Sequence, residues 1–138
     1  MGHIIEGTVL VAGVAEGPVL ASSEPLSFWG GYDQRTGEII DRRHPLSGRV
    51  AAGCVLAVPA SRGSTTTTAV LLEAVRCGMA PIAIITENPD TFLTLASVVA
   101  DELYDKPIPV IAAEGGFMSL RSGQHARVQA DGRIVITD

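Results

Sequence analysis

The sequence predicts a mixed α/β fold, in which a βαβαβ centre is joined by β elements from both ends of the chain. The first observation is an alternation of strand-length apolar runs and helix-length segments from about residue 53 onward, which implies parallel strands with crossover helices. The second is a pair of β-type segments before this centre, and the third is a hairpin signature after it. With 138 residues, 46% of them hydrophobic, we expect a single domain over residues 1–138.

Two strands are expected near the start of the chain. Residues 4–12 and residues 17–21 carry Val, Ile or Leu, and a glycine-bearing turn joins the two segments. Residues 22–48 are then polar and rich in turn-forming residues, and only Ile39 and Ile40 suggest a short strand there. We therefore expect a long irregular loop between the first strands and the centre.

Three of the six aromatic residues lie close together in this loop, namely Phe28, Trp29 and Tyr32. A long irregular segment in a compact domain is commonly a binding loop, and grouped aromatic side chains suit an interface or a pocket wall. The alternative is that Phe28 and Trp29 fill the core of the domain itself. The sequence leaves both interpretations open.

Strands and helices alternate through the centre. The expected strands are 53–58, 81–86 and 108–112, and the expected helices are about 65–77, 90–103 and, as a short one, 115–121. In the first helix Thr68, Leu71 and Leu72 begin the i, i+3, i+4, i+7 spacing of one helical face, and Gly78 supplies the stop. The second helix follows an Asn-Pro-Asp start signal at residues 88–90.

A β-hairpin is expected in the last part of the sequence. Residues 125–130 and 133–137 flank Asp131-Gly132, a pair that favours a tight turn between two antiparallel strands. These strands would join the first ones in a mixed sheet.

The composition argues against several classes of function. The net charge is −5 and the sequence pI is about 5.1, with no basic cluster beyond Arg42-Arg43, so a nucleic-acid partner is not expected. No apolar run is long enough to span a membrane, and the first residues lack the basic and apolar regions of a secretion signal. We expect a cytoplasmic protein with no nucleic-acid and no membrane partner.

Residues that ligate metals are few and scattered. Cys54 lies in an apolar run and Cys77 at a helix end, so both are expected to pack as small apolar side chains. Two cysteines cannot hold a four-thiolate iron–sulfur cluster, and His3, His44 and His125 show no metal-ligand spacing. If a metal takes part in the function, we therefore expect another chain to supply most of its ligands.

The strongest functional signal is the segment Pro59-Ala60-Ser61-Arg62-Gly63-Ser64-Thr65-Thr66-Thr67-Thr68 at the start of the first helix. The first N–H groups of a helix lack intrahelical partners and the helix dipole is positive there, so Arg62, Ser64 and Thr65 surround a site for a carboxylate or phosphate. A Ser64 helix cap is the alternative, although capping alone does not explain four consecutive threonines. Gly63 suggests a close approach of the backbone to a ligand.

Three segments together carry a resemblance to a known family, namely residues 27–45, 59–65 and 80–85. In this order, and over nearly the whole chain, they resemble the small subunit of the aconitase X family. The resemblance implies a swivelling β/β/α domain like that of aconitase, and a larger subunit that carries an iron–sulfur or iron centre. It also implies a hydro-lyase (dehydratase) whose substrate is cis-3-hydroxy-L-proline in bacteria or mevalonate 5-phosphate in archaea.

The resemblance also implies roles for individual residues. Ser64 matches the serine that accepts the proton in aconitase-like enzymes, and Gly63, Thr65 and Thr66 belong to the same substrate-binding turn. Aconitase has an arginine where this chain has Thr66, so Arg62 is the candidate for binding the substrate carboxylate. Archaeal members are expected to carry a lysine more often at the Arg62 position. Hydroxyproline is therefore favoured, with mevalonate 5-phosphate as the alternative.

In the mechanism that follows, Ser64 removes the proton next to the carboxylate of a small carboxylate substrate. The helix N-terminus and Arg62 would stabilise the serine oxygen, and the metal centre of the larger subunit would act on the leaving hydroxyl. Asp33 and His44 could support the site or lie at the interface. The alternatives are that Asp33 only forms an Asx-turn and that His44 is exposed to solvent. The residues of the long loop expected at the interface or around the site are Phe28, Trp29, Gly30, Gly31, Asp33 and His44.

Two other classes of function remain open. One is a non-catalytic swivelling module that binds a phosphorylated ligand or carries a phosphoryl group on His44, although His44 precedes Pro45 in a loop and lacks a small-residue turn into a helix. The other is a structural subunit whose anion site serves assembly. As a dehydratase subunit, the chain is expected to be metal-free and inactive alone, and to work in a heterodimer or a higher complex.

Overall fold

The computed structural model describes residues 2–62 and 66–138. Its described part contains eight β-strands, two α-helices and one short 3-10 helix. In chain order they are β1 (His3–Glu6), β2 (Thr8–Val11), β3 (Ala15–Ala21), β4 (Val55–Ala57), α1 (Thr66–Cys77), β5 (Ala83–Thr86), α2 (Thr91–Tyr104), β6 (Val110–Ala112), η1 (Phe117–Ser119), β7 (His125–Val128) and β8 (Arg133–Thr137). Each expected element of the centre and both strands of the hairpin form, with slightly different ends.

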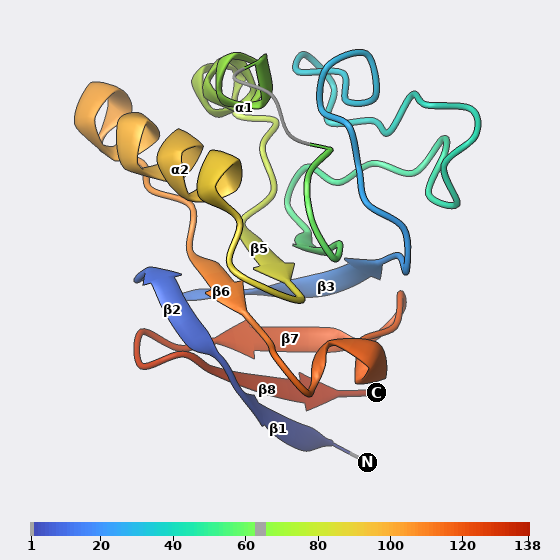
Figure 1. The fold of residues 1–138 in the computed structure, drawn as a ribbon, viewed down its shortest axis with the longest axis vertical. Helices are drawn as coiled ribbons and strands as arrows, with labels where there is room; N and C mark the ends of the chain where they lie inside the picture. The colour runs from blue at the N-terminus through green and yellow to red at the C-terminus, as the bar shows by residue number, and fades with distance from the viewer. Residues whose placement is uncertain (1, 63–65) are drawn as a thin grey trace.

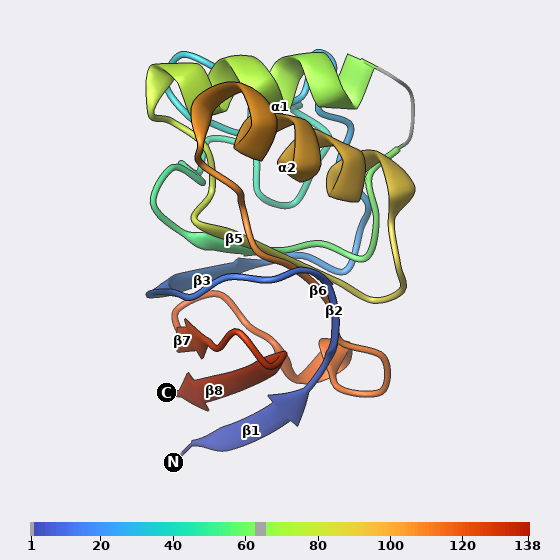
Figure 2. The same cartoon turned by 90° about the vertical axis from the view of Figure 1, so that its left-hand side faces the viewer.

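The strands form one mixed sheet in the order β1-β8-β7-β3-β4-β5-β6-β2. Strands β3 to β6 are parallel to one another, whereas β1, β7 and β8 pair antiparallel and β2 pairs antiparallel with β6. Figures 1 and 2 show three layers: the two helices, the parallel strands next to them, and the β7–β8 hairpin with β1 on the far side. This confirms the β/β/α fold with a βαβαβ centre and β elements from both termini.

The first predicted strand is split in the structure. The sequence suggested one strand over residues 4–12, but the chain bends at Gly7, so that β1 pairs with β8 and β2 pairs with β6. The Gly7 N–H donates to the Gly132 carbonyl oxygen at 3.0 Å, and a Cβ atom at Gly7 would overlap the Ile111 side chain. The bend places β1 and β2 at opposite ends of the strand order, so the sheet is nearly closed.

The expected long loop connects β3 to β4 and packs beside α1 (Figure 1). The possible strand at Ile39 and Ile40 does not form, and the bridges near it, between Tyr32 and Ile39 and between Glu38 and Val50, are isolated. The loop nevertheless has an apolar interior. Its buried side chains in the core shared with the helices are Leu26, Phe28, Tyr32, Ile39, Leu46 and Ala51.

Two hydrophobic cores lie on the two faces of the parallel strands. Along β4, Leu56 belongs to the core under the helices, whereas Val55 and Ala57 belong to the core that contains β7, β8 and β1. In β5, Ile84 and Ile85 divide between the cores in the same way. Both strands are wholly buried, as expected for parallel strands covered on both faces.

The parallel arrangement decides where a site can form. Because β4 and β5 run in the same direction, their carboxyl ends open at the same edge of the sheet, where residues 58–62 and 87–90 follow. Ligands of open α/β sheets commonly bind at this edge. Among the described residues, no helix has the length and apolar character needed to cross a membrane.

Candidate functional site

The segment after β4 is held firmly up to Arg62. The Val58 N–H donates to the Ile85 carbonyl oxygen at 3.1 Å, which continues the β4–β5 pairing beyond the strand. Leu26 then flanks the next residues: its N–H donates to the Ala60 oxygen at 3.1 Å, and its own oxygen accepts from the Arg62 N–H at 3.0 Å. The main chain is therefore held by hydrogen bonds as far as Arg62.

A buried carboxylate fixes this segment from the other side. Asp90, which is 8% exposed, is the N-cap of α2 and accepts a hydrogen bond from the Leu93 N–H at 3.0 Å. The same carboxylate accepts from the Ser61 N–H at 2.8 Å and from the Ser61 Oγ hydroxyl at 2.9 Å. Asp90 thus joins the loops that follow β4 and β5.

The sequence identified Asp90 only as part of a helix start signal. The Asn-Pro-Asp signal at residues 88–90 correctly locates the cap, since a side-chain oxygen is needed there. The bond to Ser61 spans 29 residues, and no local pattern reveals such a pairing.

The predicted proton acceptor and its two neighbours, Ser64, Gly63 and Thr65, lie outside the described residues. The structure places the predicted residues on either side of them. Arg62 is exposed, and Thr66 is the first residue of α1 and is half-buried. Both lie at the carboxyl edge of the parallel strands, where a ligand site is expected.

Arg62 lines a cavity of about 480 Å³. Two further arginines of the long loop, Arg42 and Arg43, line the same cavity, and sequence reasoning did not assign them to a site. Glu24 and Asp41 also contribute to its wall. Within residues 2–62 and 66–138 none of the three guanidinium groups takes part in an ion pair, so the cavity presents an excess of positive charge next to the start of α1.

His44 lies in the wall of this cavity and is buried, with 7% of its surface exposed. Its Nδ1 accepts a hydrogen bond from the Leu46 N–H at 3.1 Å, which leaves the ring proton on Nε2. Nε2 lies 3.3 Å from the Glu24 carbonyl oxygen and donates to it in this tautomer. The expectation of a solvated His44 is wrong, because the ring packs under the loop and both nitrogens have protein partners.

Asp33 forms a local turn. Its Oδ1 accepts from the Arg35 N–H at 2.9 Å, and its carbonyl oxygen accepts from the Gly37 N–H at 2.7 Å. This is the Asx-turn that the sequence offered as the alternative to a functional role.

The loop aromatics separate into two groups. Phe28 and Tyr32 are 0% and 2% exposed, and their ring centroids lie 5.4 Å apart in the core under the helices. Trp29 between them is 69% exposed. Gly30 has φ +75°, and at Gly31 a Cβ atom would overlap the Ser27 carbonyl oxygen. The two glycines thus permit the tight turn that leaves Trp29 outside.

Metal-ligating side chains do not gather in the part of the chain that the structure describes. No three His, Cys, Asp or Glu side chains there are arranged to hold a metal ion. Cys54 donates a weak hydrogen bond to the Val50 carbonyl oxygen at 3.4 Å, and partial burial raises the pKa of its thiol. A thiol with a raised pKa is a poor metal ligand, because metals bind the thiolate.

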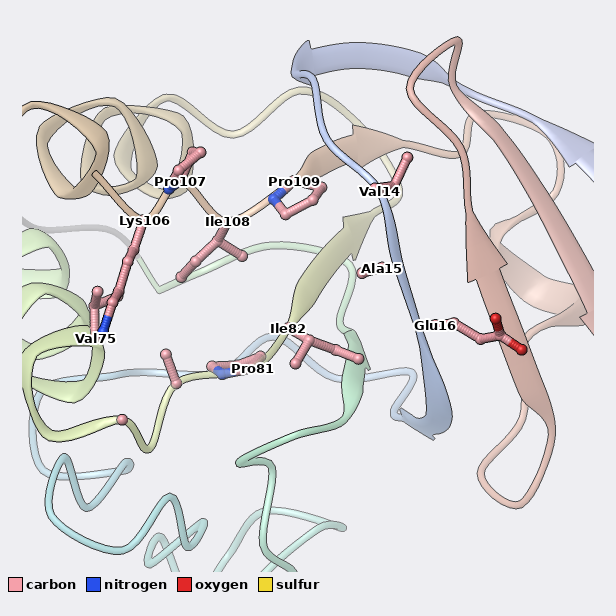
Figure 3. A pocket seen from close by; sticks show the side chains of 12 residues that line it. Val14, Ala15, Glu16, Val75, Pro81, Ile82, Lys106, Pro107, Ile108 and Pro109 are labelled. Atoms are coloured by element: carbon pink, nitrogen blue, oxygen red, sulfur yellow. The ribbon is translucent and has the colours of Figure 1, made fainter. Parts of the chain in front are cut away.

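A second cavity, of about 450 Å³, lies at the other edge of the parallel strands (Figure 3). Ala15, Ile82 and Pro109, which precede or begin strands, contribute to its largely apolar wall, with Lys106 at one side. Glu16 at its rim is 2.8 Å from His125. This is the amino edge of the strands, opposite to Ser61 and Asp90, so the two cavities are separate features.

The fold and the edge site define a β/β/α domain with an arginine-lined cavity at the start of its first helix. Comparison with known families gives the class: residues 4–137 match the model of the aconitase X swivel domain. The chain belongs to the aconitase X family.

Relatives and a solved structure agree with this assignment. The chain is 46% identical over 132 residues to cis-3-hydroxy-L-proline dehydratase of Pseudomonas aeruginosa, covering 96% of this chain but 23% of that protein. It is 37% identical over 132 residues to the phosphomevalonate dehydratase small subunit of Thermococcus onnurineus, covering 95% of each. The crystal structure of Thermococcus kodakaraensis aconitase X in its holo-form matches with a TM-score of 0.88 and 32% identity over 99% of both chains. The chain thus spans about a quarter of the length of the Pseudomonas relative.

Proposed function

We propose that this chain is the small subunit of an aconitase X-type dehydratase that acts on cis-3-hydroxy-L-proline. The observation that carries the proposal is the identity of 46% with the Pseudomonas dehydratase of that name. The carboxyl-edge position of Arg62 and of the start of α1 supports it, because that position suits an anionic substrate.

Mevalonate 5-phosphate is the second candidate substrate. One observation favours it: the chain is also similar to the phosphomevalonate dehydratase small subunit of Thermococcus onnurineus, at 37% identity over 132 residues. The three arginines around the cavity are compatible with either a carboxylate or a phosphate.

In the proposed reaction this chain takes the proton and holds the substrate. The N–H groups at the start of α1 and the Arg62 guanidinium would bind the carboxylate, which orients the proton on the neighbouring carbon towards Ser64. Ser64 would accept that proton. A serine oxygen is a weak base in water, and the helix N-terminus together with Arg62 would lower the free energy of its anionic form.

The larger subunit would supply the iron–sulfur or iron centre. The described residues of this chain do not fit such a group, since their His, Cys, Asp and Glu side chains are not clustered. We propose a heterodimer or a higher complex of the two subunits, in which this chain alone is inactive.

Ser64→Ala and Ser64→Asp test the proposal in the assembled complex. If Ser64 accepts the proton, both variants assemble and both lose about 10²-fold or more in turnover and in exchange of the substrate α-proton with solvent. Asp caps a helix as well as Ser does, so a capping role predicts that Ser64→Asp keeps its stability and that Ser64→Ala keeps near-normal turnover. Ser47→Ala, in an exposed position of the long loop, is the matched control.

The substrate is assigned by offering both candidates to the wild-type complex. Dehydration of cis-3-hydroxy-L-proline with no turnover of mevalonate 5-phosphate is the expected result. The reverse preference establishes the second candidate. A Ser64→Ala complex that exchanges the α-proton at the wild-type rate removes Ser64 from the mechanism.

A further inference from the structure

We propose that Asp90 is a positioning residue for the substrate-binding segment after β4. Through Ser61 it holds the main chain that carries Arg62, and so it sets where Arg62 meets the substrate. The inference rests on the proposed function and deepens it, because it assigns a role in turnover to a residue outside the segment after β4, in the loop that follows β5.

The Asp90 carboxylate does more than cap α2. One oxygen, Oδ1, accepts from the Leu93 N–H at 3.0 Å, which is sufficient for an N-cap. The other oxygen, Oδ2, accepts from the Ser61 N–H at 2.8 Å. The Ser61 hydroxyl lies between the two oxygens, at 2.9 Å from Oδ2 and 3.1 Å from Oδ1. The second oxygen, Oδ2, thus binds the loop after β4 and is not needed for the cap.

These bonds are partly shielded from water. Asp90 is 8% exposed and Ser61 is half-buried, and hydrogen bonds to a charged acceptor are roughly twice as strong as neutral ones. The loop after β4 is therefore strongly held at Ser61.

Leu26 completes the support. It bonds through its main chain to Ala60 on one side of Ser61 and to Arg62 on the other. Residues 60–62 are thus fixed between Leu26 and Asp90, immediately before the residues that the proposed function places at the substrate.

The other side of the site is also fixed. Helix α1 begins at Thr66, and Thr67, Val70 and Leu71 are buried in its first turns. The position of Arg62 relative to α1 therefore depends on Ser61 staying in place. A misplacement of about 1 Å can cost an enzyme about 10²-fold in rate, so the Ser61–Asp90 bonds are expected to control turnover.

Asp90→Asn separates the two functions of the carboxylate. Asn is as good an N-cap as Asp, so its oxygen can keep the bond to Leu93. Its amide nitrogen then faces the Ser61 N–H, and two donors cannot bond to each other. The substitution preserves the cap and removes the bond from the Ser61 N–H, whereas the Ser61 hydroxyl can still bond to the Asn side chain. Asp101→Asn makes the same charge change at an exposed position of α2 and is the matched control.

The amides of the isolated chain show whether the link is broken. In the Asp90→Asn chain, hydrogen exchange of the Ser61 amide should accelerate about tenfold or more, while the Leu93 amide stays protected. The melting temperature should fall moderately, because the Ser61 N–H loses a charged acceptor while the cap of α2 is retained.

Turnover of the complex with the larger subunit shows whether the link matters. We expect the Asp90→Asn complex to lose about tenfold or more in kcat with a much smaller change in KM, since Asp90 touches no substrate. Ser61→Ala leaves the cap of α2 untouched and should also lower kcat, whereas Ser61→Thr keeps a hydroxyl and should restore most of it. Ser61→Ala also keeps the test open if Asp90→Asn folds poorly.

The outcomes separate this inference from the proposed function. An Asp90→Asn complex with wild-type kcat, in a chain whose Ser61 amide has lost its protection, overturns the positioning role and leaves the proposed function standing. A Ser61→Thr complex no better than Ser61→Ala also counts against it. A wild-type complex that dehydrates neither candidate substrate overturns the proposed function and this inference together.

Discussion

The hydroxyl of Tyr32 donates a 2.7 Å hydrogen bond to the main-chain oxygen of Met79, which lies 47 residues further along the chain. Tyr32 is 2% exposed and belongs to the long loop, whereas Met79 lies in the connection between α1 and β5. This bond therefore ties the loop that lines the arginine cavity to the βαβαβ centre.

Tyr32→Phe should destabilise the chain. The substitution keeps the ring in the core but removes this bond to the half-buried Met79, and a hydrogen bond of this kind contributes about 0.5–1.5 kcal/mol. Urea unfolding measures the effect as a lower free energy of unfolding. Tyr104→Phe is the control, because the half-buried Tyr104 hydroxyl makes no hydrogen bond among the described residues. Equal effects of the two substitutions would contradict the role of the bond.

The free energy of unfolding should decrease at alkaline pH. Burial raises the pKa of Tyr32 above its ordinary value of 10.0 and that of Cys54 above 9.0. The unfolded chain therefore loses these protons at a lower pH than the folded chain, and the free energy of unfolding declines from about pH 9 upward. Urea unfolding between about pH 8 and 11 should show a shallower decline for Tyr32→Phe than for the wild type. Identical slopes would show that Tyr32 does not contribute.

Trp29→Ala should weaken the complex with the larger subunit. Trp29 is 69% exposed in the long loop, and exposed Trp residues commonly dominate binding at interfaces. The stability of the isolated chain should change by about 0.5 kcal/mol or less. Titration calorimetry with the larger subunit measures the affinity.

Phe28→Ala supplies the contrast to Trp29→Ala. Phe28 is fully buried, so its loss should cost about 3–5 kcal/mol of stability. A Trp29→Ala chain that binds the larger subunit normally and supports normal turnover would exclude the interface role.

Arg62→Ala should chiefly raise KM. The proposed partner of Arg62 is the substrate carboxylate, which is charged both before and during the reaction, so its removal weakens ground-state and transition-state binding alike. Steady-state kinetics of the complex separates this effect from a loss of kcat. Arg121→Ala changes an exposed arginine that lines a different hollow and is the control. A fall in kcat with unchanged KM would assign Arg62 to the chemical step instead.

The purified chain should contain no iron and should not dehydrate either candidate substrate. The proposed complex should contain iron in proportion to the larger subunit. Metal analysis of both preparations decides the point, and stoichiometric iron in the chain alone would contradict the assignment of the centre to the larger subunit.

The βαβαβ centre was predictable because its signals are local. The run of apolar residues at 53–58 is long enough for a strand and too short for a helix, and β4 forms within it. The helix-length segment and the stop at Gly78 define α1 in the same way, but its buried face begins at Thr67 and includes Val70 and Ala74, so the predicted face beginning at Thr68 is only partly correct. For such elements the neighbouring residues decide the structure.

Features that depend on distant contacts were not predictable. The bend at Gly7 follows from its approach to Ile111, and the burial of His44 follows from its approach to Glu24 at the beginning of the same loop. The bond from Ser61 to Asp90 joins two loops that the sheet brings together. No periodicity or propensity encodes these pairings. In the candidate site, sequence patterns thus locate the helix start but not the side chains that support it.

The closure of the sheet by the N-terminal strands has a consequence for how the chain folds. His3 of β1 lies opposite Ile136 of β8, and β2 pairs with β6, so the first strands acquire their partners only after almost all of the chain exists. Such distant pairing makes the loop-closure entropy large and the folding slow. We expect the parallel centre to form before β1 and β2 reach their native places, although these two strands precede it in the sequence.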